Sequence, residues 1–105
     1  MFFEGRPSKL SAHEALNVIG EIAADSSRIF IVEHAAKRGR QRVITRRQIE
    51  LCCQKGAVVE GPFVNAKEHW QANLFRHAAG EEITSVVAIE WAKGLIVVTV
   101  FRGRG

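Results

Sequence analysis

Residues 95–101, Leu-Ile-Val-Val-Thr-Val-Phe, restrict the fold more than any other segment of the chain. Apolar and β-branched residues fill both of their alternating sets. Successive side chains of a strand point to opposite faces of a sheet, so both faces of this strand are apolar. An exposed strand of this kind would invite aggregation. We therefore expect residues 95–101 to form an interior strand.

Other apolar runs predict further strands. Residues 28–34 are β-branched and aromatic on both alternating sets, which predicts a central strand in which His34 shares a face with Phe30 and Val32. An antiparallel meander completes the sheet, and its strands are residues 57–60, 70–78, 83–91 and 95–101. Gly61-Pro62 stops the first of these strands, and a turn at residues 92–94 joins the last two.

Two capping boxes mark helix starts, Ser11-Ala12-His13-Glu14 and Thr45-Arg46-Arg47-Gln48. The first opens a helix over residues 11–24. The second opens a helix that turns Ile49, Cys52 and Cys53 inward and ends at Gly56, and a short helix over residues 35–42 precedes it. The order of elements predicts an α+β fold, a mostly antiparallel four- to five-stranded sheet with two or three helices packed on it.

The 105 residues, 47% of them hydrophobic, predict a single domain over residues 1–105, with a frayed tail at residues 102–105. No apolar stretch is long enough to span a bilayer, and the first residues lack the pattern of a signal peptide, so we expect a cytoplasmic protein without a membrane partner. Cys52 and Cys53 are adjacent on a predicted helix, where a mutual disulfide would be strained, and we expect small, buried thiols. No metal or cofactor motif is present, and none is expected.

Positive charge is concentrated in one segment. Residues 37–47 hold six of the 15 basic residues and no acid, which leaves nine basic against 11 acidic residues elsewhere. Such a segment attracts phosphate, whether of RNA, DNA or a small ligand. Arg46 and Arg47 also stand at a helix N-terminus, where a cation opposes the helix dipole. Binding of a partner and simple exposure to solvent explain the position of these two arginines equally well.

A motif starts at the end of the predicted first strand. It reads His-Ala-x-x-Arg-x-x-x-Arg from His34 through Arg38 to Arg42, and a helix and a meander ending in Val-Thr-Val-Phe follow it. Over about residues 28–101 the chain resembles a family of short bacterial domains of unknown function with this pattern. That family is in turn similar to the BrnT and RelE/ParE toxins, compact α+β proteins of which many cut mRNA without a metal. RelE-like nucleases often use a tyrosine near the C-terminus, and this chain has none.

Metal-free RNA cleavage needs a general base and a general acid, and imidazole can serve as either. His34 is one candidate, and His77 is the other if its strand packs beside the first. Arg38, Arg42 or Arg76 would bind phosphate and stabilise its developing charge. Strand alternation turns Arg76 and His77 to opposite faces, so both cannot line one pocket.

Structural roles compete with these catalytic ones. His34 could fasten the strand end to the following turn, and Arg38 and Arg42 could pair with acidic residues, namely Glu33, Glu60 or Glu90. The chain is thus a toxin-like, metal-independent endoribonuclease, a non-catalytic module that binds single-stranded RNA through Arg38, Arg40, Arg42, Arg46, Arg47 and Arg76, or a protein-interaction domain for an acidic, antitoxin-like partner. His34 beside an arginine in an open cleft would favour cleavage, and His34 buried against backbone would favour binding alone.

Overall fold

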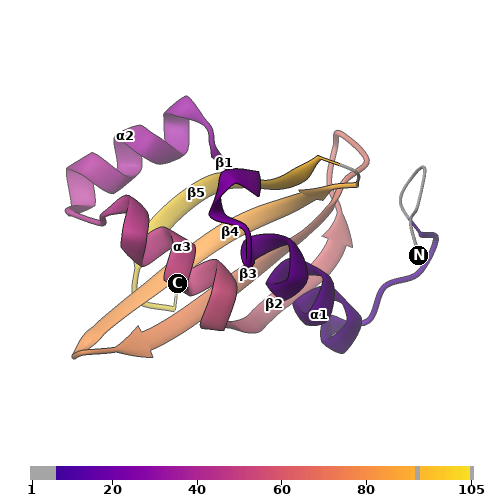
Figure 1. The fold of residues 1–105 in the computed structure, drawn as a ribbon, viewed down its shortest axis with the longest axis horizontal. Helices are drawn as coiled ribbons and strands as arrows, with labels where there is room; N and C mark the ends of the chain where they lie inside the picture. The colour runs from indigo at the N-terminus through magenta and orange to yellow at the C-terminus, as the bar shows by residue number, and fades with distance from the viewer. Residues whose placement is uncertain (1–6, 92, 105) are drawn as a thin grey trace.

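A computed structural model describes residues 7–91 and 93–104 (Figure 1). It contains three helices and a five-stranded sheet, which confirms the predicted α+β class. The elements in chain order are α1 (Ala12–Ala23), a short 3-10 turn (Ser26–Arg28), β1 (Ile29–Ile31), α2 (Glu33–Arg42), α3 (Arg46–Lys55), β2 (Ala57–Val64), β3 (Trp70–Ala78), β4 (Glu81–Glu90) and β5 (Gly94–Arg102).

The strand order is β1-β5-β4-β3-β2. β1 runs parallel to β5, and the remaining pairs, β5 with β4, β4 with β3 and β3 with β2, are antiparallel. β5 is therefore an interior strand, as its doubly apolar pattern predicts. Leu95, Val97 and Val100 on β5 are fully buried.

α1 and α3 pack against each other and cover one face of the sheet (Figure 1). Both predicted capping boxes form: Ser11 and Glu14 cap α1, and Thr45 and Gln48 cap α3. The core between helices and sheet is built from aliphatic side chains and the two thiols, among them Ile19, Ile22, Ile49, Cys52, Cys53, Leu74, Val87 and Ile89. Burial raises the pKa of both Cys52 and Cys53, as expected for inert core thiols.

The opposite face of the sheet, called the open face below, has no helix on it among the described elements (Figure 1). It carries the other alternating set of side chains, including Phe30, Ile96, Ala88 and Gln71. A β-bulge interrupts the pairing of β4 with β5, where Val98 is the extra residue between the partners of Val86 and Val87. On this face Phe30 is 49% exposed and Ile96 and Gln71 are half-buried, whereas Ala88 is buried.

The prediction of a central strand over residues 28–34 is wrong. β1 has only three residues and lies at the sheet edge, where Phe30 is 49% exposed. The chain turns helical at Glu33, so His34 lies in the first turn of α2 and shares no strand face with Phe30. Ala35 is fully buried, and its small side chain lets the start of α2 pack closely against β5.

Two smaller predictions also need correction. β2 does not stop at Gly61-Pro62 but continues to Val64 with two register shifts, which an edge strand tolerates because its outer N–H groups need no partner. The tail is held at its start: Arg102 belongs to β5, and the N–H of Gly103 donates to the carbonyl of Glu82. Gly105, at the end of the expected tail, and Ala92, in the expected turn, lie outside the described residues.

No helix of the described chain is long and apolar enough to cross a membrane.

A pair of lysine substitutions on neighbouring residues of β5 tests this arrangement. Val97 is fully buried under the helices, so Val97→Lys should lower the free energy of unfolding by more than about 3 kcal/mol by burying an unpaired charge. Val98 is half-buried on the open face, where a lysine can extend its ammonium group to water. Val98→Lys should therefore lower the free energy of unfolding by about 1 kcal/mol or less, measured by urea denaturation. Equal losses would contradict the assigned faces.

Candidate nucleic-acid interface

α2 covers the edge of β5 beyond the end of β1. The backbone N–H of Val32 donates to the carbonyl of Val97, and the Arg42 guanidinium donates to the carbonyl of Val100 at 3.1 Å. Gly39 permits the tight turn that follows α2, since a Cβ there would lie 3.1 Å from the backbone oxygen of Ile44. α2 thus replaces a strand at this edge and closes it against other chains.

The helical repeat of about 100° per residue divides the rest of α2 into two flanks and a crest. Ala35, Gly39 and Arg42 face the sheet, so Ala36 and Arg40 lie on the flank toward α3. His34, Arg38 and Gln41 fall on the opposite flank, and Lys37 lies at the crest, pointing away from the protein. The motif residues His34 and Arg38 are consequently on the flank that faces away from α3.

A pocket of about 310 Å³ lies between α2 and α3. Its floor is apolar and its polar lining consists of two guanidinium groups. We call it the α2–α3 pocket, and its lining residues are Ile31, Ala36, Gly39, Arg40, Ile44, Arg46 and Ile49. An apolar floor with a few convergent polar groups is the usual composition of a binding pocket.

The arginines of this region outnumber the acids that pair with them. Arg40 lies 3.5 Å from Glu33, but the two side chains are 67% and 89% exposed, so water screens their attraction. Arg46 and Arg47 share a single acid, Glu50, at 2.8 and 3.5 Å. The second nitrogen of Arg46 donates to backbone carbonyls of the segment before α2, which leaves its charge uncompensated by those contacts.

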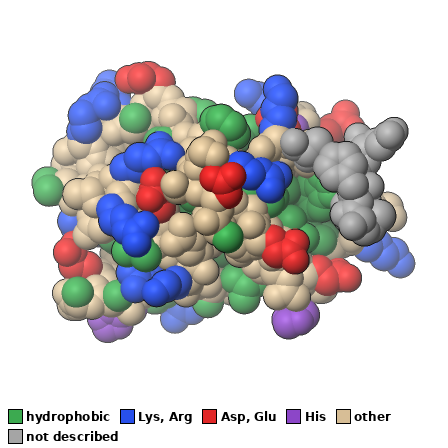
Figure 2. Space-filling model, in the orientation of Figure 1, with side chains coloured by type: hydrophobic (Ala, Val, Ile, Leu, Met, Phe, Trp, Pro, Cys, Tyr) green, Lys and Arg blue, Asp and Glu red, His purple; other side chains and the backbone are tan. Residues whose placement is uncertain are grey.

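The net positive charge of the protein lies in this region. Residues 33–50 contain six basic and two acidic residues, a net charge of +4, which equals the formal net charge of the whole chain. Figure 2 shows Lys and Arg side chains gathered over α2 and α3, with acidic side chains among them. A polyanion that approaches this side of the molecule therefore meets most of the available attraction.

Arg42 has a structural role. Besides its bond to β5, its own carbonyl accepts a hydrogen bond from Arg102 at 2.9 Å, and Arg102 also donates to the carbonyl of Val43 at 2.8 Å. Within the described chain neither Arg38 nor Arg42 forms the scaffold ion pairs that the sequence left open, and Arg38 instead donates to Gln41 at 2.9 Å. Binding phosphate through Arg42 would require it to release the edge of β5.

His34 is exposed, and the structure gives its ring no hydrogen bond to another described residue. It is therefore not buried against backbone, as a structural histidine at a strand end would be. It also lies on a convex helix flank with Arg38 one turn further along. The geometry offers an accessible imidazole beside a guanidinium, outside any enclosed cleft formed by α2 alone.

The structure does not bring His34 and His77 together. His77 pairs with Glu82 on β4. The backbone N–H of Val32, two residues before His34, donates to the carbonyl of Val97 on β5. Val97 in turn pairs with Val87 on β4. Glu82 and Val87 are five residues apart on one strand, and that number of residues spans roughly 17 Å. One substrate phosphate cannot contact both imidazoles.

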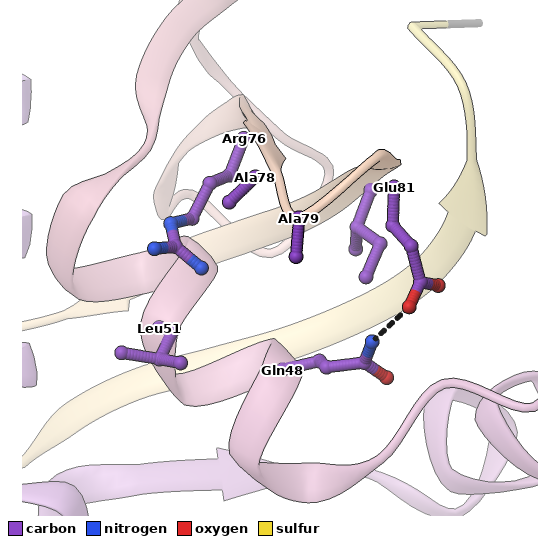
Figure 3. A pocket seen from close by; sticks show the side chains of 7 residues that line it. Gln48, Leu51, Arg76, Ala78, Ala79 and Glu81 are labelled. Carbon is purple, nitrogen blue, oxygen red and sulfur yellow. Dashed lines mark hydrogen bonds between the residues drawn. The ribbon is translucent and has the colours of Figure 1, made fainter.

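Arg76 and His77 point to opposite faces of β3, as strand alternation predicts. His77 is exposed on the open face, whereas Arg76 extends toward α3 over a pocket of about 240 Å³ (Figure 3). At the other end of this pocket Gln48 donates to Glu81 at 3.3 Å. Glu81 also pairs with Arg102, and this contact holds the pKa of the Glu81 carboxyl below its usual value. Arg76 is thus separated from the α2 arginines.

Residues 31–102 match a family described as a domain of unknown function, DUF4258. The match covers more than half of the chain, and the protein belongs to this family. No match was found among curated proteins or among solved structures.

The sequence did not identify every accessible group near α2. Phe30 was assigned to a covered strand but is exposed, and His69, in the loop between β2 and β3, lines a pocket on the open face. The signal for Phe30 was the brevity of the apolar run before the helix-forming Ala35 and Ala36. For His69 the sequence holds no signal, because its position depends on how β2 and β3 pair. Among the described residues no three His, Cys, Asp or Glu side chains are grouped to hold a metal.

Single alanine substitutions should distinguish the structural Arg42 from the exposed Arg40. Arg42→Ala should lower the free energy of unfolding by about 1 kcal/mol or more, because the Val100 carbonyl loses a charged donor at a partly buried position. Arg40→Ala should change it by less than about 0.5 kcal/mol, since its ion pair is exposed. Thermal and urea denaturation would measure both. Equal stability of the two variants would show that the contact of Arg42 with β5 contributes nothing.

Proposed function

We propose that this domain binds single-stranded RNA through the α2 surface, defined as the side chains of Lys37, Arg38, Arg40, Arg46 and Arg47. The observation that carries the proposal is the α2–α3 pocket, in which Arg40 and Arg46 flank an apolar floor within the segment that holds the net charge of the chain. Arg40, whose ion pair with Glu33 is exposed to water, can bind phosphate oxygens with paired hydrogen bonds, and Arg46 adds its positive charge. An apolar floor accepts the face of a base.

Exposed apolar side chains next to the α2 surface favour a single strand over a duplex. Phe30 is 49% exposed on β1, and Val43 is 75% exposed in the turn between α2 and α3. Val43 also has a φ of 54°, which is unfavourable for a β-branched residue. Unstacked bases pack on such side chains, whereas the bases of a duplex are already stacked. Sequence-dependent recognition of single strands is chiefly a property of RNA-binding proteins, so RNA is the expected ligand.

The proposal is tested by the salt dependence of RNA affinity. Replacing Lys37, Arg40 and Arg47 together by Ala should weaken binding of a short single-stranded RNA. It should also flatten the slope of log affinity against log salt by roughly 0.7 for each phosphate that the variant no longer neutralises. Arg46 is left in place because its guanidinium bonds backbone carbonyls, and its removal would disturb the fold. Fluorescence anisotropy over a range of salt concentrations gives the slope.

A matched control removes the same charge elsewhere. Lys9, Lys55 and Lys93 are exposed and lie outside the α2 surface, so their joint replacement by Ala should leave the slope nearly unchanged. If both triple variants flatten the slope equally, binding is unspecific attraction by net charge, and the α2 surface is not the binding site. If only an acidic protein, and no RNA, binds in an α2-dependent way, the surface serves protein interaction instead.

Cleavage of the bound RNA, as a toxin-like endoribonuclease would perform it, is a second candidate. The observation in its favour is that His34 is accessible and stands one helical turn before Arg38. An imidazole can take the proton of an attacking 2′-hydroxyl while a neighbouring guanidinium binds the phosphate. His77 is too far from His34 to act as its acid partner, so water or a substrate group would have to protonate the leaving oxygen.

His34→Gln tests cleavage. If His34 is a general base, the variant should cut RNA about 10²–10⁴-fold more slowly than the wild type while it retains its melting temperature and RNA affinity. His77→Gln is the control and should cut at the wild-type rate. Incubation with labelled RNA, with and without a chelator, followed by gel analysis of fragments, measures both. A wild-type protein that binds RNA without producing fragments would reduce the function to binding alone.

A further inference from the structure

The open face contains a pocket of about 280 Å³ close to the start of α2. Its floor is formed by Ala88, Ile96 and Val98, with Val32 at one wall and the loop between β2 and β3 at the other. We call it the open-face pocket, and its lining includes the loop residues Asn65, Ala66, Lys67 and His69 and the adjoining Gln71 of β3. The α2–α3 pocket lies on the helix side of the sheet, so the two pockets flank α2 and β1 from opposite sides.

Asn65 fixes the loop wall. Its Oδ1 accepts hydrogen bonds from the backbone N–H groups of Lys67 at 2.9 Å and His69 at 3.0 Å. Its Nδ2 donates to Oε1 of Gln71 at 2.9 Å. The side-chain oxygen of Gln71 therefore accepts one hydrogen bond and the amide plane is held, while both N–H groups of Nε2 can donate to a ligand.

The remaining polar groups of the wall have no partner within the described residues. The structure gives no hydrogen bond to the imidazole of His69 or ion pair to the ammonium of Lys67. The ammonium of Lys67 and the N–H groups of Gln71 can donate to a ligand, and His69 can donate through either ring nitrogen. The pocket thus combines an apolar floor with a rim that consists mainly of hydrogen-bond donors and carries positive charge.

Exposed apolar side chains connect this pocket with the flank of α2 that bears His34 and Arg38. Val32, which lines the pocket and precedes α2 directly, is 39% exposed, and Phe30 beside it on the same face is 49% exposed. A strand that follows the cations of α2 would pass these side chains before it reaches the pocket.

We propose that the open-face pocket receives one unstacked base of the bound RNA and favours a base that presents carbonyl oxygens, uracil or guanine. This inference rests on the proposed function. The amide of Gln71 donates to the base edge, the base lies on Ile96 and Val98, and Lys67 attracts the adjoining phosphate. The excess of donors and the positive rim select an anionic chain with acceptor-rich edges, which a nucleic acid supplies.

Gln71→Glu is the sharpest test because it exchanges one group for another of the same shape. The new carboxylate keeps an oxygen for Asn65 and replaces the free N–H groups by an acceptor. Uracil and cytosine differ at two neighbouring positions of the base edge, where uracil has a carbonyl oxygen and an N–H group and cytosine has an amino group and a nitrogen acceptor. The wild type should bind short oligouridine about two- to ten-fold more tightly than oligocytidine, the range of one net hydrogen bond, and Gln71→Glu should reverse this order.

Asn73→Asp is the matched control. Asn73 is the next residue on the same face of β3, and the substitution adds the same charge without entering the pocket lining. It should weaken both oligonucleotides equally and keep the preference for uridine. Identical effects of Gln71→Glu and Asn73→Asp, or a wild type that binds both oligonucleotides equally, would overturn the base pocket while α2-dependent binding stands.

A titration with uridine monophosphate separates this inference from the proposed function. Binding in the pocket should shift the side-chain amide signals of Gln71 in an NMR spectrum of the wild type, and Gln71→Leu should abolish nucleotide binding. If the protein binds no RNA strand but these signals shift, the proposed function fails and the base pocket stands alone. If neither RNA nor the mononucleotide binds, both are wrong.

Discussion

The closure of the β5 edge is the constraint on which the rest of the structure depends. β5 is apolar on both faces and must lie inside the sheet, yet β1 pairs with only its first part. α2 shields the remainder through Ala35, Gly39 and the bond from Arg42 to Val100. Because this packing needs only small residues and one arginine, the other positions of α2 are free to carry charge. The basic character of the α2 surface is therefore a consequence of how the edge is covered.

The same packing explains why α2 has cations on more than one side. A helix lying on a sheet face buries about half of its circumference, whereas α2 at the edge contacts β5 along one narrow stripe. Arg40, Lys37 and Arg38 then point toward the helix layer, away from the protein and away from α3, respectively. A flexible polyanion can follow this ridge from the α2–α3 pocket to the open face, while a rigid duplex would contact one side only.

The sequence predicts the elements whose signals are local. Both capping boxes, the interior position of β5 and the α+β class follow from patterns within a few residues, and the structure confirms them. Prediction from the sequence fails where contacts between distant parts of the chain determine the structure. The apolar run before His34 reads as a covered strand, but whether Phe30 is covered depends on a sheet edge that no local pattern describes. β2 likewise continues past Gly61-Pro62 because it is an edge strand, which only the sheet order reveals.

In the candidate site, too, the sequence predicts the features set by nearby residues and misses those set by contacts between distant ones. The density of arginine locates the basic region correctly, yet it does not distinguish Arg42, which bonds a strand almost sixty residues away, from Arg40, which faces solvent. The motif spacing places His34 and Arg38 together because both lie on one helix. Pairing His34 with His77 required adjacent strands, and two strands intervene. Any chemistry at His34 must therefore be assembled from α2, the neighbouring open face and the substrate, because the two histidines cannot act on one bond.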